Sequence, residues 1–286
     1  MKPAPFSYHR ATSLQDAHEA LRRHGPEARI IAGGQSLMPM MALRIAQPSV
    51  LVDIGHLSEL RGLSLTDGVL RAGALTRHAE LLSSPVVAQA APLLAQAVPH
   101  VAHAAIRNRG TLGGSLALAD PAAELPACAL ALNAVIHLHG AGGARVVRAS
   151  EFFQGLYTTA LTDADILTRI EFPAAGPGQR FFFDEVSRRR GDYAMAGLAA
   201  VSCADGSVRL TFLGCGDRPL RASQAEGLVA AALSNQSMPT RTRIKAALQQ
   251  DLDPPSDLQA DAATRIHLAA VLVERALTSW CKEAET

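Results

Sequence analysis

The first 55 residues carry three short apolar runs and one amphipathic stretch. Residues 6–12 are expected to be extended, residues 28–33 and 49–55 carry the β-branched side chains typical of strands, and residues 13–25 show helical spacing. Ser13 is a suitable N-cap for that helix, and Gly25 is a suitable end. Because a helix between two strands commonly returns the chain to a parallel sheet, the pattern predicts a small βαβ-like unit.

Residues 57–173 mix the two periodicities. Segments 68–75 and 134–140 predict strands, whereas segment 78–101 has a helical pattern that is interrupted by Pro85, Pro92 and Pro99. This mixture is typical of an α+β fold rather than of a regular α/β alternation. A cluster of proline and glycine in residues 172–180 then predicts a linker.

Strand patterns return after the linker, in residues 180–187, 196–204 and 207–216, with a turn at Asp205 and Gly206. Helical patterns follow around residues 224–233, 240–250 and 261–280. We therefore expect a boundary near residue 178. It separates a domain of residues 1–177, with subdomains of about 1–55 and 56–177, from a smaller sheet-plus-helices domain of residues 178–286.

The composition indicates a folded protein without a strong overall charge. Of the 286 residues, 48% are hydrophobic and 19% are charged, which is enough to fill a sizeable core. Lys plus Arg number 27 against 26 for Asp plus Glu, so no global charge attracts nucleic acid or an anionic membrane. We expect no nucleic-acid partner, and no membrane span because no apolar run reaches about 18 residues.

The cysteines and the N-terminal residues favour a cytoplasmic protein. Cys128, Cys203, Cys215 and Cys281 show no C-x-x-C spacing, which argues against a disulfide framework, a zinc ribbon or an iron–sulfur cluster in this chain. Residues 1–13 lack the continuous apolar stretch of a secretory signal. We therefore expect small buried thiols and a cytoplasmic location.

The common nucleotide and catalytic motifs fail in this sequence. Gly140, Gly142 and Gly143 do not continue into G-x-G-x-x-G, and they predict a hairpin turn instead. The chain has no P-loop, no H-E-x-x-H and no G-x-S-x-G. His137 and His139 share one face of a predicted strand, but no third metal ligand is near. We predict no metal site and no catalytic acid or base.

Two segments place adjacent glycines before a small hydroxyl residue: "AGGQS" at residues 32–36 and "TLGGS" at residues 111–115. Adjacent glycines permit positive φ angles and remove two Cβ atoms, so backbone N–H groups can converge on an anion. Each segment alone is better explained as an ordinary tight turn between core elements. Together, the two segments could hold the two phosphates of a pyrophosphate without any lysine.

These segments, with "SRRRGDYAMAG" at residues 187–197, resemble the FAD-binding medium subunits of molybdenum hydroxylases. The resemblance covers nearly the whole chain, with the segments in the same order. Members of that family include the carbon monoxide dehydrogenase medium chain and the flavin domain of xanthine dehydrogenase. It implies a two-subdomain FAD-binding domain of the vanillyl-alcohol-oxidase (PCMH) type, followed by a C-terminal flavin-subunit domain. The expected boundary near residue 178 agrees with that division.

The resemblance also implies which residues hold FAD. The pyrophosphate segments would be Ala32, Gly33, Gly34, Gln35 and Ser36, and then Thr111, Gly113, Gly114 and Ser115. Val101 and Tyr193 would lie beside the isoalloxazine, Asp120 and Glu124 near polar groups of the cofactor, and Leu167 against its apolar surface. An aromatic ring and a compact branched side chain suit a flat conjugated system.

The implied enzyme divides its chemistry among three chains. A large subunit with a molybdenum cofactor hydroxylates the substrate, a small subunit with two [2Fe-2S] clusters transfers the electrons, and this chain carries FAD. The resemblance implies a dimer of such heterotrimers. FAD suits the last position because it accepts electrons singly and delivers two to a diffusible acceptor.

Three departures and two alternatives accompany the resemblance. Many relatives carry a lysine where this chain has Asp184 and Glu185, Glu124 replaces a shorter Asp, and Ser115 replaces the commoner Asn. One alternative is a stand-alone flavin oxidoreductase of the same fold, which would need an acid or base over the flavin. The other is a non-catalytic nucleotide-binding scaffold.

Overall fold

The N-terminal unit is a parallel sheet of three strands in the order β1 (Ser7–Arg10), β3 (Val50–Asp53), β2 (Ala28–Ile31). The computed structural model describes residues 2–283. Helix α1 (Leu14–His24) packs on this sheet, and the Ser13 side chain caps it by accepting a hydrogen bond from the Asp16 amide at 3.1 Å. The predicted βαβ-like unit is confirmed. The short helices η1 (Gly25–Glu27) and α2 (Leu37–Ala42) complete the unit.

The second sheet is antiparallel and has five strands. Their order is β4 (Leu63–Thr66), β5 (Val69–Gly73), β10 (Ile166–Pro173), β6 (Val135–Gly140) and β7 (Gly143–Arg148). The predicted hairpin turn is confirmed, because Gly140 pairs with Gly143. The predicted linker begins too early: Phe172 and Pro173 still pair with Leu70 and Val69, and the Phe172 side chain is fully buried.

Proline divides the helical stretch that lies between β5 and β6 in the chain, as the sequence predicts. Pro85 opens α4 (Pro85–Ala90), Pro92 opens α5 (Pro92–Ala97), and Pro99 lies in η3 (Val98–His100). Proline is tolerated at the first helical position because its missing N–H would have no partner there. The other elements of this region, several of which no pattern predicted, are η2 (Ser58–Leu60), α3 (His78–Ser83), α6 (Ala104–Arg107), α7 (Leu112–Leu118), α8 (Glu124–Ala131), α9 (Ala149–Phe152), β8 (Phe153–Gly155) and β9 (Thr158–Thr159).

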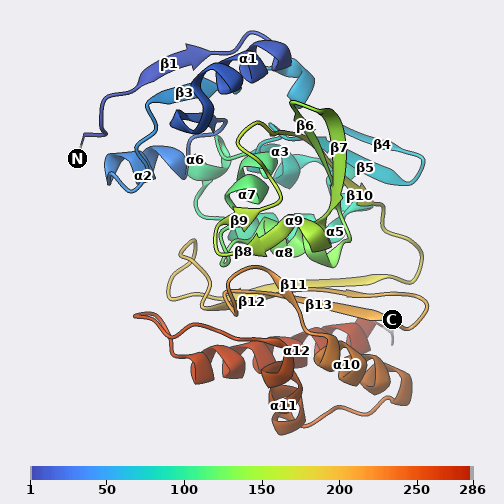
Figure 1. The fold of residues 1–286 in the computed structure, drawn as a ribbon. Coiled ribbons are helices and arrows are strands. Elements are labelled where there is room, and N and C mark those ends of the chain that lie inside the picture. The colour runs from blue at the N-terminus through green and yellow to red at the C-terminus, as the bar shows by residue number, and fades with distance from the viewer. Residues whose placement is uncertain (1, 284–286) are drawn as a thin grey trace.

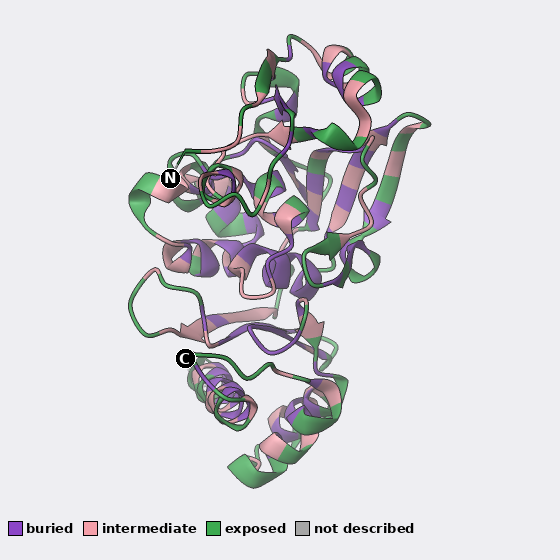
Figure 2. Cartoon of the chain, turned by 60° about the vertical axis from the view of Figure 1, so that its left-hand side comes forward, coloured by how far each residue is buried: buried purple, intermediate pink, exposed green. Residues whose placement is uncertain are grey.

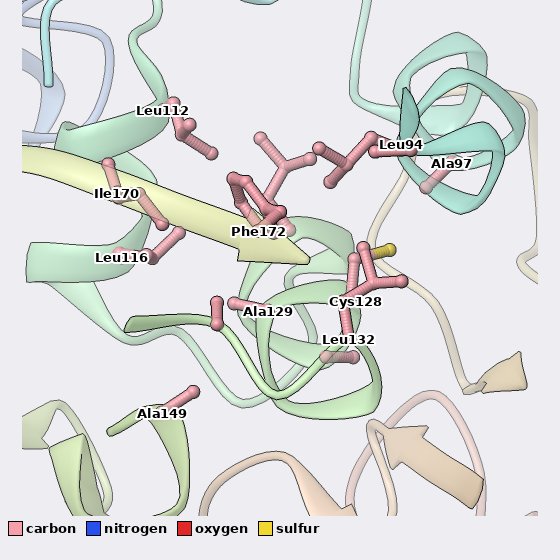
Figure 3. Close-up of a cluster of buried hydrophobic side chains, with 14 of the residues drawn as sticks. Leu94, Ala97, Leu112, Leu116, Cys128, Ala129, Leu132, Ala149, Ile170 and Phe172 are labelled. Carbon is pink, nitrogen blue, oxygen red and sulfur yellow. The ribbon is translucent and has the colours of Figure 1, made fainter. Parts of the chain in front are cut away.

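The helices of this second unit share a core with the antiparallel sheet. Figure 3 shows Leu94 of α5, Leu112 and Leu116 of α7 and Cys128 of α8 around Phe172 of β10. All five side chains are fully buried. The cluster fixes α7 and α8 against the sheet, and these two helices carry several of the predicted site residues.

The C-terminal unit is a four-stranded antiparallel sheet followed by three helices (Figure 1). Its strands are β11 (Arg180–Val186), β12 (Ala196–Ser202), β13 (Val208–Leu213) and β14 (Leu220–Arg221), and its helices are α10 (Ser223–Asn235), α11 (Arg241–Asp251) and α12 (Ala262–Glu283). The predicted strands and helices are confirmed, with ends that differ by a few residues. No helix within residues 2–283 is long and apolar enough to cross a membrane.

Both faces of this last sheet are covered. Every residue of β12 is buried, because α5 and α8 pack on this strand from one side and α12 from the other, while α10 covers the neighbouring β13 (Figures 1 and 2). Ala199 and Val201 face the core that contains Leu94 and Cys128. Leu198, one residue before Ala199, faces the core under α12. Successive residues of a strand point to opposite faces, so β12 contributes to both cores. The strand therefore packs the C-terminal unit against the first 173 residues.

Candidate functional site

A cavity of about 1170 Å³ lies where the parallel sheet, the antiparallel sheet and the loop before β12 meet. All fourteen predicted site residues line it: Ala32, Gly33, Gly34, Gln35, Ser36, Val101, Thr111, Gly113, Gly114, Ser115, Asp120, Glu124, Leu167 and Tyr193. Small-molecule sites commonly measure roughly 300–1,000 Å³. The volume therefore suits a large ligand such as a dinucleotide.

The two adjacent glycines at the end of β2 have different physical roles. Gly34 has a φ of +71°, which lets the chain turn sharply into α2 without a Cβ penalty. Gly33 has no positive φ, but a Cβ there would overlap the carbonyl oxygen of Arg109 and stand 2.9 Å from its carbonyl carbon. Gly33 thus allows the first glycine segment to pack on the backbone just before Thr111. The two predicted segments are neighbours in space.

The first segment offers unused backbone donors to the cavity. Within residues 2–283, the amides of Gly33, Gly34, Gln35 and Ser36 have no protein hydrogen-bond acceptor. The Gln35 side chain folds back and donates to the Gly33 carbonyl oxygen at 2.9 Å, which helps to hold the turn. Consecutive free N–H groups in a turn form a concave site for anionic oxygens.

The second segment is the start of a helix, and not a loop whose amides converge on an anion. Thr111 is the N-cap of α7, and its Oγ1 accepts a hydrogen bond from the Gly114 amide at 3.1 Å. The Gly113 amide donates to the Ala74 carbonyl oxygen at 2.8 Å, and a Cβ on Gly113 would stand 2.7 Å from the Ala74 Cβ. Gly113 therefore permits close packing of α7 against residue 74, and Gly113, Gly114 and Ser115 all line the cavity.

Val101 and Tyr193 belong to two turns that lie against each other. Arg107 Nη1 donates to the carbonyl oxygens of Val101 and Ala102, both at 2.9 Å, and so fixes the turn after η3. Gly191, with a φ of +86°, packs so closely on this turn that a Cβ would stand 2.6 Å from His103 Cε1. Tyr193 is 61% exposed at the mouth of the cavity, whereas Val101 is buried.

Leu167 lies on the wall of the cavity formed by β10. Its side chain is 6% exposed, and the pairing of β10 with β6 shifts register between Leu167 and Arg169. A register shift of this kind locally bends a strand and redirects its side chains. Leu167 therefore presents an apolar surface to the cavity from a position inside the sheet.

Asp120 and Glu124 are two of the acidic residues that line the cavity. Asp120 is 7% exposed, accepts from the Ala122 amide at 2.9 Å and accepts from the Tyr157 hydroxyl at 3.2 Å. Burial raises the pKa of Tyr157 to about 12, and the charge of Asp120 acts in the same direction. Burial also raises the pKa of Glu124 to about 8, with the charge of Glu185 as the second cause. The Glu124 carboxyl thus holds its proton at neutral pH.

Two further cavity residues were missed by sequence reasoning. Tyr157 lies in the turn between β8 and β9, where it has a positive φ of 51°. His78 is 4% exposed, and its Nε2 lies 3.1 Å from Ser115 Oγ, while its Nδ1 has no partner among the described residues. Burial lowers the pKa of His78 to about 4, so the ring is neutral. Neither residue belongs to a motif, so no local pattern identifies it.

The two histidines of β6 have separate partners. His139 Nδ1 lies 2.8 Å from His18 Nε2, and His137 Nε2 lies 3.2 Å from a carboxylate oxygen of Glu171. Among residues 2–283, no group of three or more His, Cys, Asp or Glu side chains is arranged to hold a metal ion.

Comparison with known proteins defines the class of this protein. Residues 4–175 match the family described as the FAD binding domain in molybdopterin dehydrogenase, and residues 181–280 match the CO dehydrogenase flavoprotein C-terminal domain. The chain therefore belongs to the family of FAD-binding medium subunits of molybdenum hydroxylases, and it has the α+β fold expected for that family.

Individual relatives span the whole chain. The 6-hydroxypseudooxynicotine dehydrogenase complex subunit alpha of Paenarthrobacter nicotinovorans is 38% identical over 97% of this chain and 95% of its own length. The carbon monoxide dehydrogenase medium chain of Hydrogenophaga pseudoflava is 34% identical over 99% of both chains. A solved carbon monoxide dehydrogenase from that organism superposes with a TM-score of 0.91, and quinoline 2-oxidoreductase from Pseudomonas putida 86 with 0.89, over 99% and 100% of both chains, respectively.

The residues of the cavity suit FAD. Four free amides at residues 33–36 offer donors for phosphate oxygens, and no lysine among residues 2–283 lines the cavity. Val101, Leu167 and Tyr193 offer apolar and aromatic surface for a flat ring system, and Asp120 and Glu124 offer groups that accept or donate hydrogen bonds. The cavity therefore offers both backbone amides and side-chain groups to a single ligand.

Proposed function

We propose that this chain carries FAD in a heteromeric molybdenum hydroxylase and passes electrons from [2Fe-2S] clusters of a partner subunit to an external acceptor. One observation supports this role most strongly. The fourteen residues predicted to hold FAD come from segments that are far apart in the sequence, and all of them line one cavity. Nothing in ordinary core packing requires that convergence.

FAD supplies electron storage in this proposal, and the chain supplies position and polarity. The amides of residues 33–36 bind the pyrophosphate, and Thr111, Gly113, Gly114 and Ser115, at the start of α7, line the same cavity. Val101 and Tyr193 lie beside the ring system, Leu167 packs on its apolar surface, and Asp120 and Glu124 bind polar groups. Tyr193, exposed at the mouth, controls access to the ring edge.

The partners in this proposal are a large subunit with the molybdenum cofactor and a small subunit with two [2Fe-2S] clusters, assembled as a dimer of heterotrimers in the cytoplasm. The names of relatives support a complex, since they include a medium chain and a subunit alpha. The four cysteines are all free, which supports a reducing compartment and leaves cluster binding to another chain.

Within the chain, we propose an FAD-binding domain of residues 1–177, with subdomains of about 1–55 and 56–177, and a C-terminal domain of residues 178–286. The segment between β10, which ends at Pro173, and β11, which begins at Arg180, supports this boundary. The two family matches, to residues 4–175 and 181–280, fall on either side of it.

Purification of the native protein tests this function. We expect the full chain to co-purify with two other polypeptides, molybdenum and iron, and to bind FAD with the absorbance of an oxidised flavin near 450 nm. If the chain catalyses full turnover by itself, without molybdenum and iron, it is the stand-alone flavin oxidoreductase and the subunit role is wrong. A chain that binds no FAD under any condition is a scaffold, and the proposal is then wrong.

A further inference from the structure

His78, the first residue of α3, lies beside Ser115 of α7, and both residues line the proposed FAD cavity. Backbone hydrogen bonds hold the start of α3 against the segment that leads into α7. The His78 amide donates to the Gly110 carbonyl oxygen at 3.0 Å, and the Leu112 amide donates to the Thr76 carbonyl oxygen at 2.9 Å. In this arrangement His78 Nε2 stands 3.1 Å from Ser115 Oγ. Backbone contacts therefore fix the position of the ring.

The other edge of the His78 ring packs on backbone. The residue is 4% exposed, and its Nδ1 has no hydrogen-bond partner among residues 2–283. Gly110 lies against this edge, because a Cβ on Gly110 would stand 2.9 Å from His78 Cε1 and 3.0 Å from Nδ1. Buried N–H groups without an acceptor are rarer in native proteins than buried acceptors without a donor. The surroundings therefore favour the tautomer that carries its proton on Nε2.

The electrostatic surroundings of the ring agree with this tautomer. Burial lowers the pKa of His78 to about 4, the charge of Arg107 acts in the same direction, and a hydrogen bond with the Thr111 backbone opposes both. The ring is therefore neutral at pH 7 and carries a single N–H. A hydrogen bond raises the pKa of an imidazole when the ring is the donor. Since Nδ1 has no partner, the donating N–H is on the Nε2 edge.

We propose that His78 is a positioning residue that makes the Ser115 hydroxyl a hydrogen-bond donor to FAD. With its proton on Nε2, the ring donates to Ser115 Oγ, so the hydroxyl proton is free to point into the cavity. No other hydrogen bond of Ser115 Oγ is present within residues 2–283. A phosphate oxygen suits this donor, because it is anionic and only accepts. The role rests on the proposed function, since it requires FAD in the cavity.

The serine at position 115 is what makes residue 78 important. Many relatives that the sequence resembles carry Asn at this position, and an Asn amide has two N–H donors of its own. A hydroxyl has one proton, which it can direct either to a neighbouring ring or to a ligand. Residue 78 therefore decides whether Ser115 presents a donor, whereas an Asn at position 115 would present one in any case.

Nitrogen NMR of the full-length apoprotein, labelled with nitrogen-15 in histidine, tests the tautomer without FAD. His78→Gln identifies the His78 signals among the ten histidines, and correlation with the carbon-bound ring protons distinguishes Nδ1 from Nε2. At pH 7.5 we expect a protonated Nε2 and an unprotonated Nδ1. A proton on Nδ1, or a ring that exchanges between both tautomers, overturns the proposal whether or not the chain binds FAD.

Titration of the apoprotein with FAD tests the consequence. Ser115→Ala and His78→Leu should each weaken FAD binding about tenfold, as expected for the loss of one hydrogen bond to an anionic oxygen. The double variant should bind no more weakly than either single variant. His78→Gln should retain most of the affinity, because its amide nitrogen can replace Nε2 as the donor. Ser83→Ala is the matched control: its hydroxyl is exposed on α3, donates to the Ala79 carbonyl oxygen at 3.1 Å and lies outside the cavity.

Ser115→Asn supplies the background that separates positioning from packing. In this background, His78→Leu should change FAD affinity less than about twofold, because the two side chains are no longer coupled. An equal loss of affinity in both backgrounds means that residue 78 acts through packing, and it overturns the proposal. Wild-type affinity of His78→Leu overturns it as well. If His78→Leu does not fold, the tautomer of the wild type decides. A wild-type chain that binds no FAD overturns the proposed function, and the role of His78 with it.

Discussion

Gly33 and Arg109 are in direct backbone contact: a Cβ on Gly33 would overlap the Arg109 carbonyl oxygen. This contact joins the turn after β2 to the segment that leads into α7, and so it sets the distance between the free amides of residues 33–36 and the Ser115 hydroxyl. The turn after the parallel sheet meets the loop between α6 and α7 at this point. The geometry of the proposed pyrophosphate site therefore depends on a glycine that touches backbone rather than ligand.

Gly33→Ala should weaken both the fold and FAD binding. The new methyl must push the backbone of residues 109 and 110 away, and overpacking of this kind costs about 1–3 kcal/mol. The free amides then move out of register with the phosphates, and each 1.4 kcal/mol lost weakens binding about tenfold. Thermal melting measures the first effect, and titration of the apoprotein with FAD measures the second.

Gly142→Ala is the matched control for this variant. Gly142 lies in the hairpin turn between β6 and β7, has no positive φ, and a Cβ there meets nothing within 4 Å. We expect unchanged melting and FAD affinity. Equal behaviour of the two alanine variants would contradict the proposed role of the Gly33 contact.

The sequence predicts the strands around these glycines well but assigns the second glycine pair the wrong local structure. The apolar runs before Gly33 are short and bounded by glycine, so the sequence pattern clearly predicts strands there. In contrast, the α7 residues "LGGSLAL" carry two glycines, which disfavour a helix, and the helix forms because Leu112 and Leu116 are buried against β10. Tertiary packing overrides the local preference, and no pattern in one sequence reports it.

The functional site likewise contains residues that the sequence predicts and residues that it does not. The fourteen residues follow from motifs and from the family resemblance, because each motif names residues that are close in sequence. The Glu185 and His100 contact joins residues from β11 and η3 that share no motif. These two residues meet because β11 packs on α5. The position of β11 relative to α5 is set only when the sheet folds.

Asp120→Asn should lower the pKa of Tyr157 from about 12 towards its ordinary value. Burial holds the phenol neutral in the first place, and the Asp120 charge, with its hydrogen bond, adds to that effect. The amide removes the charge and leaves burial. Ultraviolet titration of tyrosinate measures the change, with Tyr157→Phe identifying its signal among the three tyrosines. A Tyr157 titration that is the same in Asp120→Asn and the wild type would show that the contact is absent in solution.

His78 should make the folded state less stable in acid. Its folded pKa of about 4 lies below the ordinary value of 6.5, so the unfolded chain binds a proton that the native chain does not. Its contribution is complete above pH 6.5 and is lost as the pH falls towards 4. At 1.36 kcal/mol per unit, the loss reaches about 3 kcal/mol.

Denaturant unfolding of the wild type and His78→Gln from pH 7.5 to pH 4.5 measures this contribution. The variant retains a polar side chain near Ser115 but does not titrate, so its stability should fall less steeply with acid. Because other groups titrate in both proteins, only the difference between the two curves is informative. Parallel curves would mean that His78 is not buried as a neutral ring.

Residues 1–177 and 178–286 should not fold independently when they are expressed apart. Phe183, Ala199 and Val201 of the C-terminal sheet belong to the same buried cluster as Leu94 and Cys128. Separation exposes this apolar surface on both fragments, and exposed patches of this kind promote aggregation. Co-expression should restore a soluble complex that binds FAD, as gel filtration and flavin absorbance would show. Two fragments that each give a cooperative, reversible melt would instead establish two independent domains.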